Sequence, residues 1–123
     1  MADLFLDTAP YNAHTTAVDS LKSGLPVITL MGQSFASRVA ASLLKAIGLS
    51  ELITKTQDEY EALAIKLALS PKKLKDIQAK LALNRQTAPL FNTPIFTRNL
   101  EKAYIKMYER YQADLEPDHI RIA

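Results

Sequence analysis

The N-terminal segment constrains the fold of this chain more than any other. Residues 3–7 (Asp-Leu-Phe-Leu-Asp) are typical of a short buried strand with an apolar centre, and a loop containing proline follows. Two threonines then open a predicted helix from about Thr16 to Ser23, and Gly24 suits the left-handed position that ends many helices. The carboxyl end of a strand therefore leads to the amino end of a helix. Free N–H groups and the positive end of the helix dipole meet there, which favours phosphate binding.

The following elements complete a strand–helix–strand unit. Residues 26–30 (Pro-Val-Ile-Thr-Leu) form a second predicted strand, and 52–54 are the candidate for a third. Strands joined by one helix are expected to lie parallel, with a right-handed crossover. Residues 34–47 form a predicted helix whose apolar face includes Phe35. Further predicted helices cover about 57–69, 71–84 and 95–113, and two prolines exclude regular structure in 87–94.

Length and composition fit one domain at most. The chain has 123 residues, of which 48% are hydrophobic and 23% charged, as in an ordinary soluble globular protein. We expect residues 1–113 to be folded and residues 114–123 to form a flexible tail. A net charge of +2 does not indicate binding to nucleic acid or to a membrane surface. Signal-peptide features and membrane-spanning apolar runs are absent, so the expected location is the cytoplasm.

Neither a metal site nor a nucleic-acid interface is indicated. Cysteine is absent, and the two histidines, His14 and His119, lie too far apart for metal-ligand spacing. The lysines of 72–80 interleave with leucine and isoleucine and have no aromatic residue among them, which is typical of the solvated face of an amphipathic helix. Three tyrosines between 104 and 111 recur at helical spacing, which favours a packing stripe.

Two interpretations of the first helix start are open. Thr16-Ala17-Val18-Asp19 fits a capping box, in which Thr16 and Asp19 only satisfy the N–H groups of the helix end. In the alternative, the first-turn N–H groups and the threonine hydroxyls bind an anionic oxygen, and Asp19 accepts hydrogen bonds from ribose hydroxyls. His14 precedes the helix and suits a neutral donor to a phosphate or sugar oxygen.

Several motifs, in one order, resemble a known family. They are Leu6-Asp7-Thr8, Asn12-Ala13-His14-Thr15-Thr16, Gly24-Leu25-Pro26-Val27-Ile28-Thr29, Ala36-Ser37-Arg38-Val39-Ala40-Ala41-Ser42, Glu59-Tyr60, Pro89-Leu90-Phe91-Asn92-Thr93 and Leu100-Glu101-Lys102-Ala103-Tyr104. Over roughly residues 2–112 the chain resembles the C-terminal part of the catalytic domain of O-GlcNAc transferase-like glycosyltransferases, bacterial homologues included, which have the GT-B fold. The resemblance implies an α/β, Rossmann-like half-lobe with two or three parallel strands. Residues 1–113 would then be the C-terminal part of the nucleotide-sugar-binding lobe.

The resemblance also implies a function and a donor site. Enzymes of that family transfer a sugar, N-acetylglucosamine in the branch that this chain resembles, from a UDP donor to Ser or Thr of proteins. Their His-Thr-Thr segment contacts the donor diphosphate and sugar, and the following Asp holds the ribose. By position these donor-binding residues are His14, Thr15, Thr16 and Asp19. No metal or other cofactor is implied beyond the UDP-sugar substrate, since the chain has no Asp-x-Asp pattern.

Other parts of the family pattern have no match in this chain. The candidate catalytic base, the diphosphate-binding lysine and the uracil contacts lie upstream of these motifs, and the tetratricopeptide repeats common in the family are missing. We therefore expect a donor-binding fragment of a larger enzyme, with no catalytic residue and no transferase activity of its own. Upstream regions would bind the acceptor protein. The alternative is a non-catalytic, stand-alone remnant that binds nucleotide or another protein.

Overall fold

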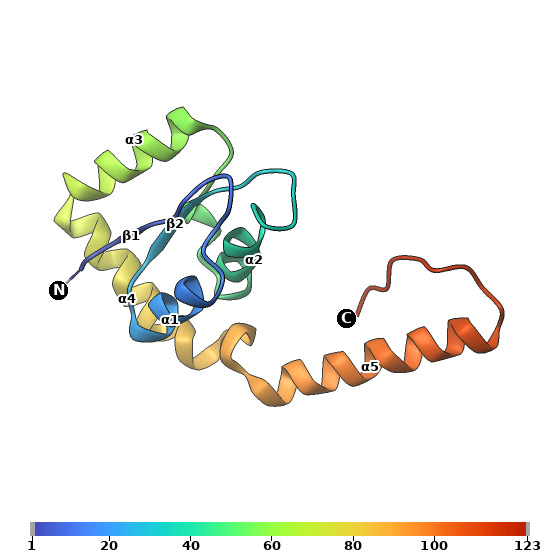
Figure 1. Ribbon diagram of the computed structural model, residues 1–123. Coiled ribbons are helices and arrows are strands. Elements are labelled where there is room, and N and C mark those ends of the chain that lie inside the picture. Colours follow the sequence, from blue (N-terminus) through green and yellow to red (C-terminus); the bar gives the residue numbers. More distant parts are fainter. Residues whose placement is uncertain (1, 123) are drawn as a thin grey trace.

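A small parallel sheet lies at the centre of the computed structural model, which describes residues 2–122 (Figure 1). Its strands are β1 (Phe5–Leu6), β2 (Val27–Leu30) and β3 (Ile53–Thr54), and they lie in the order β1-β2-β3. Both neighbouring pairs are parallel, with Phe5 opposite Val27 and Thr29 opposite Ile53. The expected α/β class with parallel strands is confirmed.

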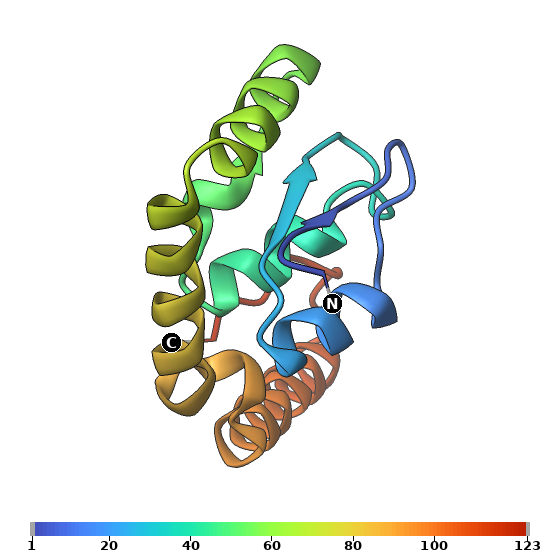
Figure 2. The ribbon, with the colours of Figure 1, turned by 90° about the vertical axis from the view of Figure 1, so that its left-hand side faces the viewer.

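Helices follow each strand. They are α1 (Thr15–Ser23), α2 (Val39–Ala46), α3 (Gln57–Ala68), α4 (Pro71–Thr87) and α5 (Thr93–Gln112), with short 3-10 turns at Ser50–Leu52 and Pro89–Phe91. Figure 2 shows α3 and α4 running along one side of the molecule, and β2 lies beside α3. Within residues 2–122, no helix combines the length and apolar character needed to cross a membrane.

The core lies between the sheet and the first four helices. Fully buried side chains come from α1 (Leu21), β2 (Ile28), α2 (Leu44) and α4 (Leu81), so segments distant in sequence share one apolar cluster. Burying each such side chain contributes about 2 kcal/mol of hydrophobic free energy. The same cluster fixes β2 in the middle of the sheet, and the ends of α1 and α2 are positioned relative to it.

Local signals in the sequence set several helix ends. The N–H of Gly24, at φ +91°, donates to the Leu21 carbonyl, and this left-handed residue ends α1 as predicted. At the start of α3, the Thr56 hydroxyl accepts the Glu59 N–H at 3.2 Å. The Glu59 carboxylate in turn accepts the N–H of Lys55 at 2.8 Å. Polar capping of this kind is a local property, so the sequence predicts it.

The predicted start of the second helix at residue 34 is wrong. A tight turn precedes α2, in which the Gly32 N–H donates to the Ser37 carbonyl and the Ser34 and Ser37 hydroxyls lie 2.9 Å apart. A Cβ on Gly32 would lie only 2.5 Å from the Ser37 hydroxyl, so the turn needs glycine there. Because the helix begins only at Val39, Phe35 does not join its buried face and is 81% exposed.

Helix α5 extends away from the rest of the molecule (Figure 1). None of its residues is buried, and the tyrosines at 104, 108 and 111 are exposed, so the predicted packing stripe is not packed within the described chain. Beyond α5, residues 113–122 have no helix or strand. This segment returns along α5, where the Lys106 ammonium donates to the Arg121 carbonyl at 3.0 Å.

Candidate functional site

The loop after β1 places the start of α1 at the carboxyl edge of the sheet. Its last residue before the helix is His14, which occupies the N-cap position and accepts the Val18 N–H on its carbonyl at 3.1 Å. No side chain caps this helix end. By helix geometry, the N–H groups of Thr15, Thr16 and Ala17 then have no acceptor within α1. The end of α1 is therefore open to an anionic ligand.

The capping box proposed for this helix is not formed. Because α1 begins at Thr15, Thr16 already lies inside the helix and Asp19 lies beyond its first turn. Thr15, Thr16 and Asp19 are all exposed, and residues three and four positions apart share one helix face. The opposite face is buried through Ala17, Ser20 and Leu21. The capping interpretation is wrong, and donor binding by the exposed face stays a prediction.

His14 lies between two aromatic rings. The Tyr11 ring stacks on it with centroids 5.0 Å apart, and the Phe35 ring meets it edge-on at 6.1 Å. The Nε2 atom is buried and has no hydrogen-bond partner within residues 2–122. An imidazole nitrogen can donate or accept one hydrogen bond, so Nε2 has an unused hydrogen-bonding capacity, and its contact with a phosphate or sugar stays a prediction.

Asn12 joins the loop to the end of β2. Its side chain is 1% exposed, and its amide donates to the Thr8 carbonyl at 3.0 Å and to the Leu30 carbonyl at 3.5 Å. The backbone N–H of Asn12 donates to the Ala36 carbonyl at 3.0 Å. Asn12 is not among the predicted site residues. Its position two residues before His14 could have indicated that it supports the loop that carries His14.

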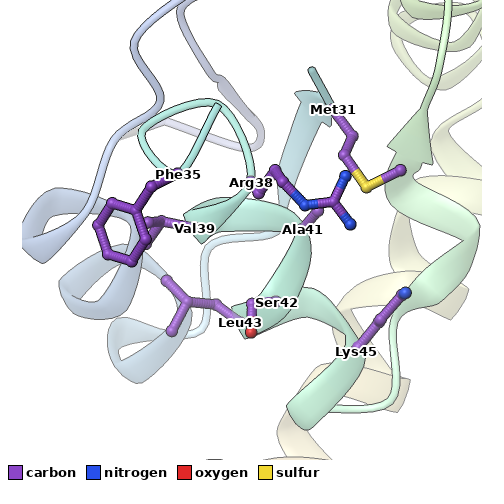
Figure 3. A pocket seen from close by; sticks show the side chains of 8 residues that line it. All are labelled: Met31, Phe35, Arg38, Val39, Ala41, Ser42, Leu43 and Lys45. Atoms are coloured by element: carbon purple, nitrogen blue, oxygen red, sulfur yellow. The ribbon is translucent and has the colours of Figure 1, made fainter. Parts of the chain in front are cut away.

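Two hollows border this edge of the sheet. One, of about 480 Å³, lies between the loops that follow β1 and β2 and is lined by Ala9, Pro10, Leu30, Gly32, Gln33, Ser34 and Ser37. The other, of about 490 Å³, runs along α2 and carries the cations Arg38 and Lys45 (Figure 3). Phe35 borders this second hollow and also contacts the His14 ring. In the part of the chain described, no group of three His, Asp or Glu residues could hold a metal ion.

Comparison with known proteins identifies the family. Residues 1–100 match the profile of glycosyl transferase family 41. The chain belongs to glycosyl transferase family 41. The residues of the candidate site, His14 to Asp19, all lie within the matched segment.

Relatives of this family 41 chain include plant and animal proteins. It is 41% identical over 123 residues to a probable UDP-N-acetylglucosamine–peptide N-acetylglucosaminyltransferase SEC of Arabidopsis thaliana, covering 99% of this chain and 13% of that protein. It is 38% identical over 120 residues to a UDP-N-acetylglucosamine–peptide N-acetylglucosaminyltransferase of Caenorhabditis elegans, covering 98% of this chain and 10% of that protein. The family 41 chain thus spans a small part of the length of these relatives.

A solved structure confirms the fold of the family 41 chain. The chain resembles a mutant of the O-GlcNAc transferase of Thermobaculum terrenum with a TM-score of 0.81 and 37% sequence identity. The match covers 86% of this chain and 20% of that one. The fold is therefore that of part of a GT-B glycosyltransferase, as the motifs predict.

Proposed function

We propose that this chain forms the donor-binding part of a protein O-glycosyltransferase, which transfers N-acetylglucosamine from a UDP donor to Ser or Thr side chains. Family membership and the names of the relatives support this class of reaction. The observation that carries the proposal is the uncapped N-terminus of α1, which presents His14, Thr15 and Thr16 at the carboxyl edge of the sheet.

The N-terminal end of α1 would bind the diphosphate and stabilise its negative charge. Its free N–H groups and the positive end of the helix dipole stabilise negative charge, and the hydroxyls of Thr15 and Thr16 add neutral donors. Charge on UDP increases as its bond to the sugar breaks, so donors held at this position stabilise the transition state more than the bound substrate. In this proposal the helix end, rather than a metal ion, offsets the charge of the diphosphate.

Asp19 would bind the nucleoside. It lies one turn beyond Thr15 on the same exposed face, so a donor with its diphosphate at the helix end would extend along that face. A carboxylate has two acceptor oxygens and can accept hydrogen bonds from both ribose hydroxyls. We assign the catalytic base and the acceptor-protein contacts to regions of the enzyme other than this chain. The cytoplasmic location stays a prediction.

The exposed apolar side chains of α5 favour one alternative function, a non-catalytic module that contacts another protein. Such a module could still bind nucleotide at α1, so nucleotide binding and transfer are tested separately.

Titration of the isotope-labelled chain with UDP tests the donor site. Amide shift changes should cluster at residues 13–19, with an affinity on the order of millimolar, about 4 kcal/mol of binding free energy. Uridine lacks the diphosphate and serves as the control, so it should leave the amides of Thr15 and Thr16 nearly unchanged. Shift changes centred on the lysines of 72–80 would contradict the proposed site.

A further inference from the structure

Asp7 is a buried carboxylate that the proposed donor contacts do not use. It follows β1 directly and is 5% exposed. Its Oδ1 atom accepts the backbone N–H of Thr8 at 2.9 Å and that of Ala13 at 2.7 Å. Its Oδ2 atom accepts the hydroxyl of Thr29 at 2.6 Å. Three donors therefore surround one carboxylate beneath the loop that leads to α1.

The Oδ1 atom holds both ends of that loop. Thr8 is the first residue after Asp7, and Ala13 is the last before His14, so one oxygen closes the segment 8–13. Hydrogen bonds to an ionised acceptor are stronger than those between neutral groups. Because Ala13 adjoins the N-cap residue, this bond sets where the backbone enters α1 and which way its free N–H groups face.

Asp7 is also attached to the sheet and to a helix on its other sides. Thr29 belongs to the central strand β2, so its hydroxyl fixes the carboxylate to the core. Tyr60 of α3 donates its hydroxyl to the Asp7 carbonyl at 2.8 Å. Burial raises the pKa of Tyr60, and the negative charge of Asp7 raises it further, which keeps this hydroxyl protonated as a donor.

We propose that Asp7 is a positioning residue for donor binding: its carboxylate holds the loop 8–13 so that the open end of α1 faces the diphosphate before the donor arrives. The inference rests on the proposed function. A loop that is already ordered loses less conformational entropy when a ligand binds, so the ordering contributes to affinity although Asp7 does not touch the donor.

The test compares wild type with Asp7→Ala in two measurements. Without ligand, hydrogen exchange at the Ala13 amide should become about tenfold faster or more, because its acceptor is gone. With UDP, the Kd should rise by about threefold or more, because the helix end is no longer held. Exchange at core amides such as that of Ile28 should change far less than exchange at Ala13.

Two variants separate positioning from general stability. Tyr60→Phe removes a donor to the Asp7 carbonyl but leaves both carboxylate oxygens with their partners, so its melting temperature should fall while its Kd for UDP stays within about twofold of wild type. Asp7→Asn keeps a side-chain carbonyl that can accept the Thr8 and Ala13 N–H groups. It should restore both the slow Ala13 exchange and the UDP affinity.

The outcomes distinguish the inference from the proposed function. A folded Asp7→Ala that binds UDP like wild type, or that keeps slow Ala13 exchange, overturns the positioning role. Where Asp7→Ala does not fold, Asp7→Asn decides: a folded Asp7→Asn that keeps slow Ala13 exchange but loses UDP binding also overturns it. If wild type shows no UDP-dependent shifts at residues 13–19, the donor-site proposal fails, and the exchange measurement alone then shows whether Asp7 orders the loop.

Discussion

At the scale of single residues, helix register decides what Asp19 can do. A start at Thr16 itself as N-cap would have placed Asp19 where a capping box needs a carboxylate. The observed N-cap, His14, lies two residues earlier, so Asp19 lies in the second turn. Asp19 is exposed on the surface of α1. It is therefore available to a ligand.

Asp19→Ala should weaken the contact with the nucleoside and leave the contact with the diphosphate unchanged. We expect UDP to bind about tenfold more weakly, since a charged group contributes roughly 1.5 kcal/mol or more per hydrogen bond. Inorganic pyrophosphate, which has no ribose, should bind as it does to wild type. The melting temperature should stay nearly unchanged, because Asp19 makes no cap and no buried contact.

Asp76→Ala is the matched control for this experiment, because Asp76 is an exposed aspartate on α4. It should leave both affinities unchanged. Equal UDP affinity in wild type and Asp19→Ala, or an equal loss for UDP and pyrophosphate, would count against the ribose contact.

At the scale of elements, α5 differs from the other helices. α1, α2, α3 and α4 each contribute buried residues to the core, whereas α5 contributes none over twenty residues. Its apolar side chains are instead exposed, among them Phe96, Leu100 and Tyr108. Helix stability in proteins comes mainly from packing of an apolar face, and here that face is uncovered.

Removal of α5 should therefore lower the stability of the fold only slightly. A chain that ends at Asn92 keeps the whole buried cluster, and we expect its melting temperature to change by less than about 5 °C, equivalent to about 1 kcal/mol. The control is a chain that ends at Leu69. This chain loses α4 with the fully buried Leu81, and it should not unfold cooperatively. Loss of cooperative unfolding in the chain that ends at Asn92 would show that α5 stabilises the body.

At the scale of the whole molecule, the chain corresponds to a small part of the enzymes it resembles. It matches 20% of the O-GlcNAc transferase structure and at most 13% of the two relatives named above. Asp7, which adjoins the loop 8–13, is buried and already accepts three hydrogen bonds. It is therefore poorly placed to remove a proton from an acceptor hydroxyl.

The chain alone should have no glycosyltransferase activity. Radiolabelled UDP-N-acetylglucosamine, incubated with the chain and a mixture of acceptor proteins, should give no transfer above a heat-killed control. A preparation that binds UDP at residues 13–19 but transfers nothing would fit a donor-binding part of an enzyme. Transfer above the control would mean that a base and an acceptor site are present within these residues.

The sequence by itself determined the strands, the parallel βαβ unit, the end of α1 at Gly24 and the cap of α3 at Thr56, because each depends on residues close together in the chain. Its motifs also identified the family. These signals are local patterns of apolar, glycine and capping residues, and distant contacts do not alter them.

The tertiary structure alone decided the docking of the turn before α2, where the Asn12 N–H donates to the Ala36 carbonyl, the exposure of Phe35 and of the α5 tyrosines, and the hydrogen bonds of Asp7. Asp7 meets Thr29, which is 22 residues away, and Tyr60, which is 53 residues away. No local pattern encodes which donors a folded chain brings to one carboxylate, or which apolar faces it leaves uncovered. Both depend on how distant elements pack.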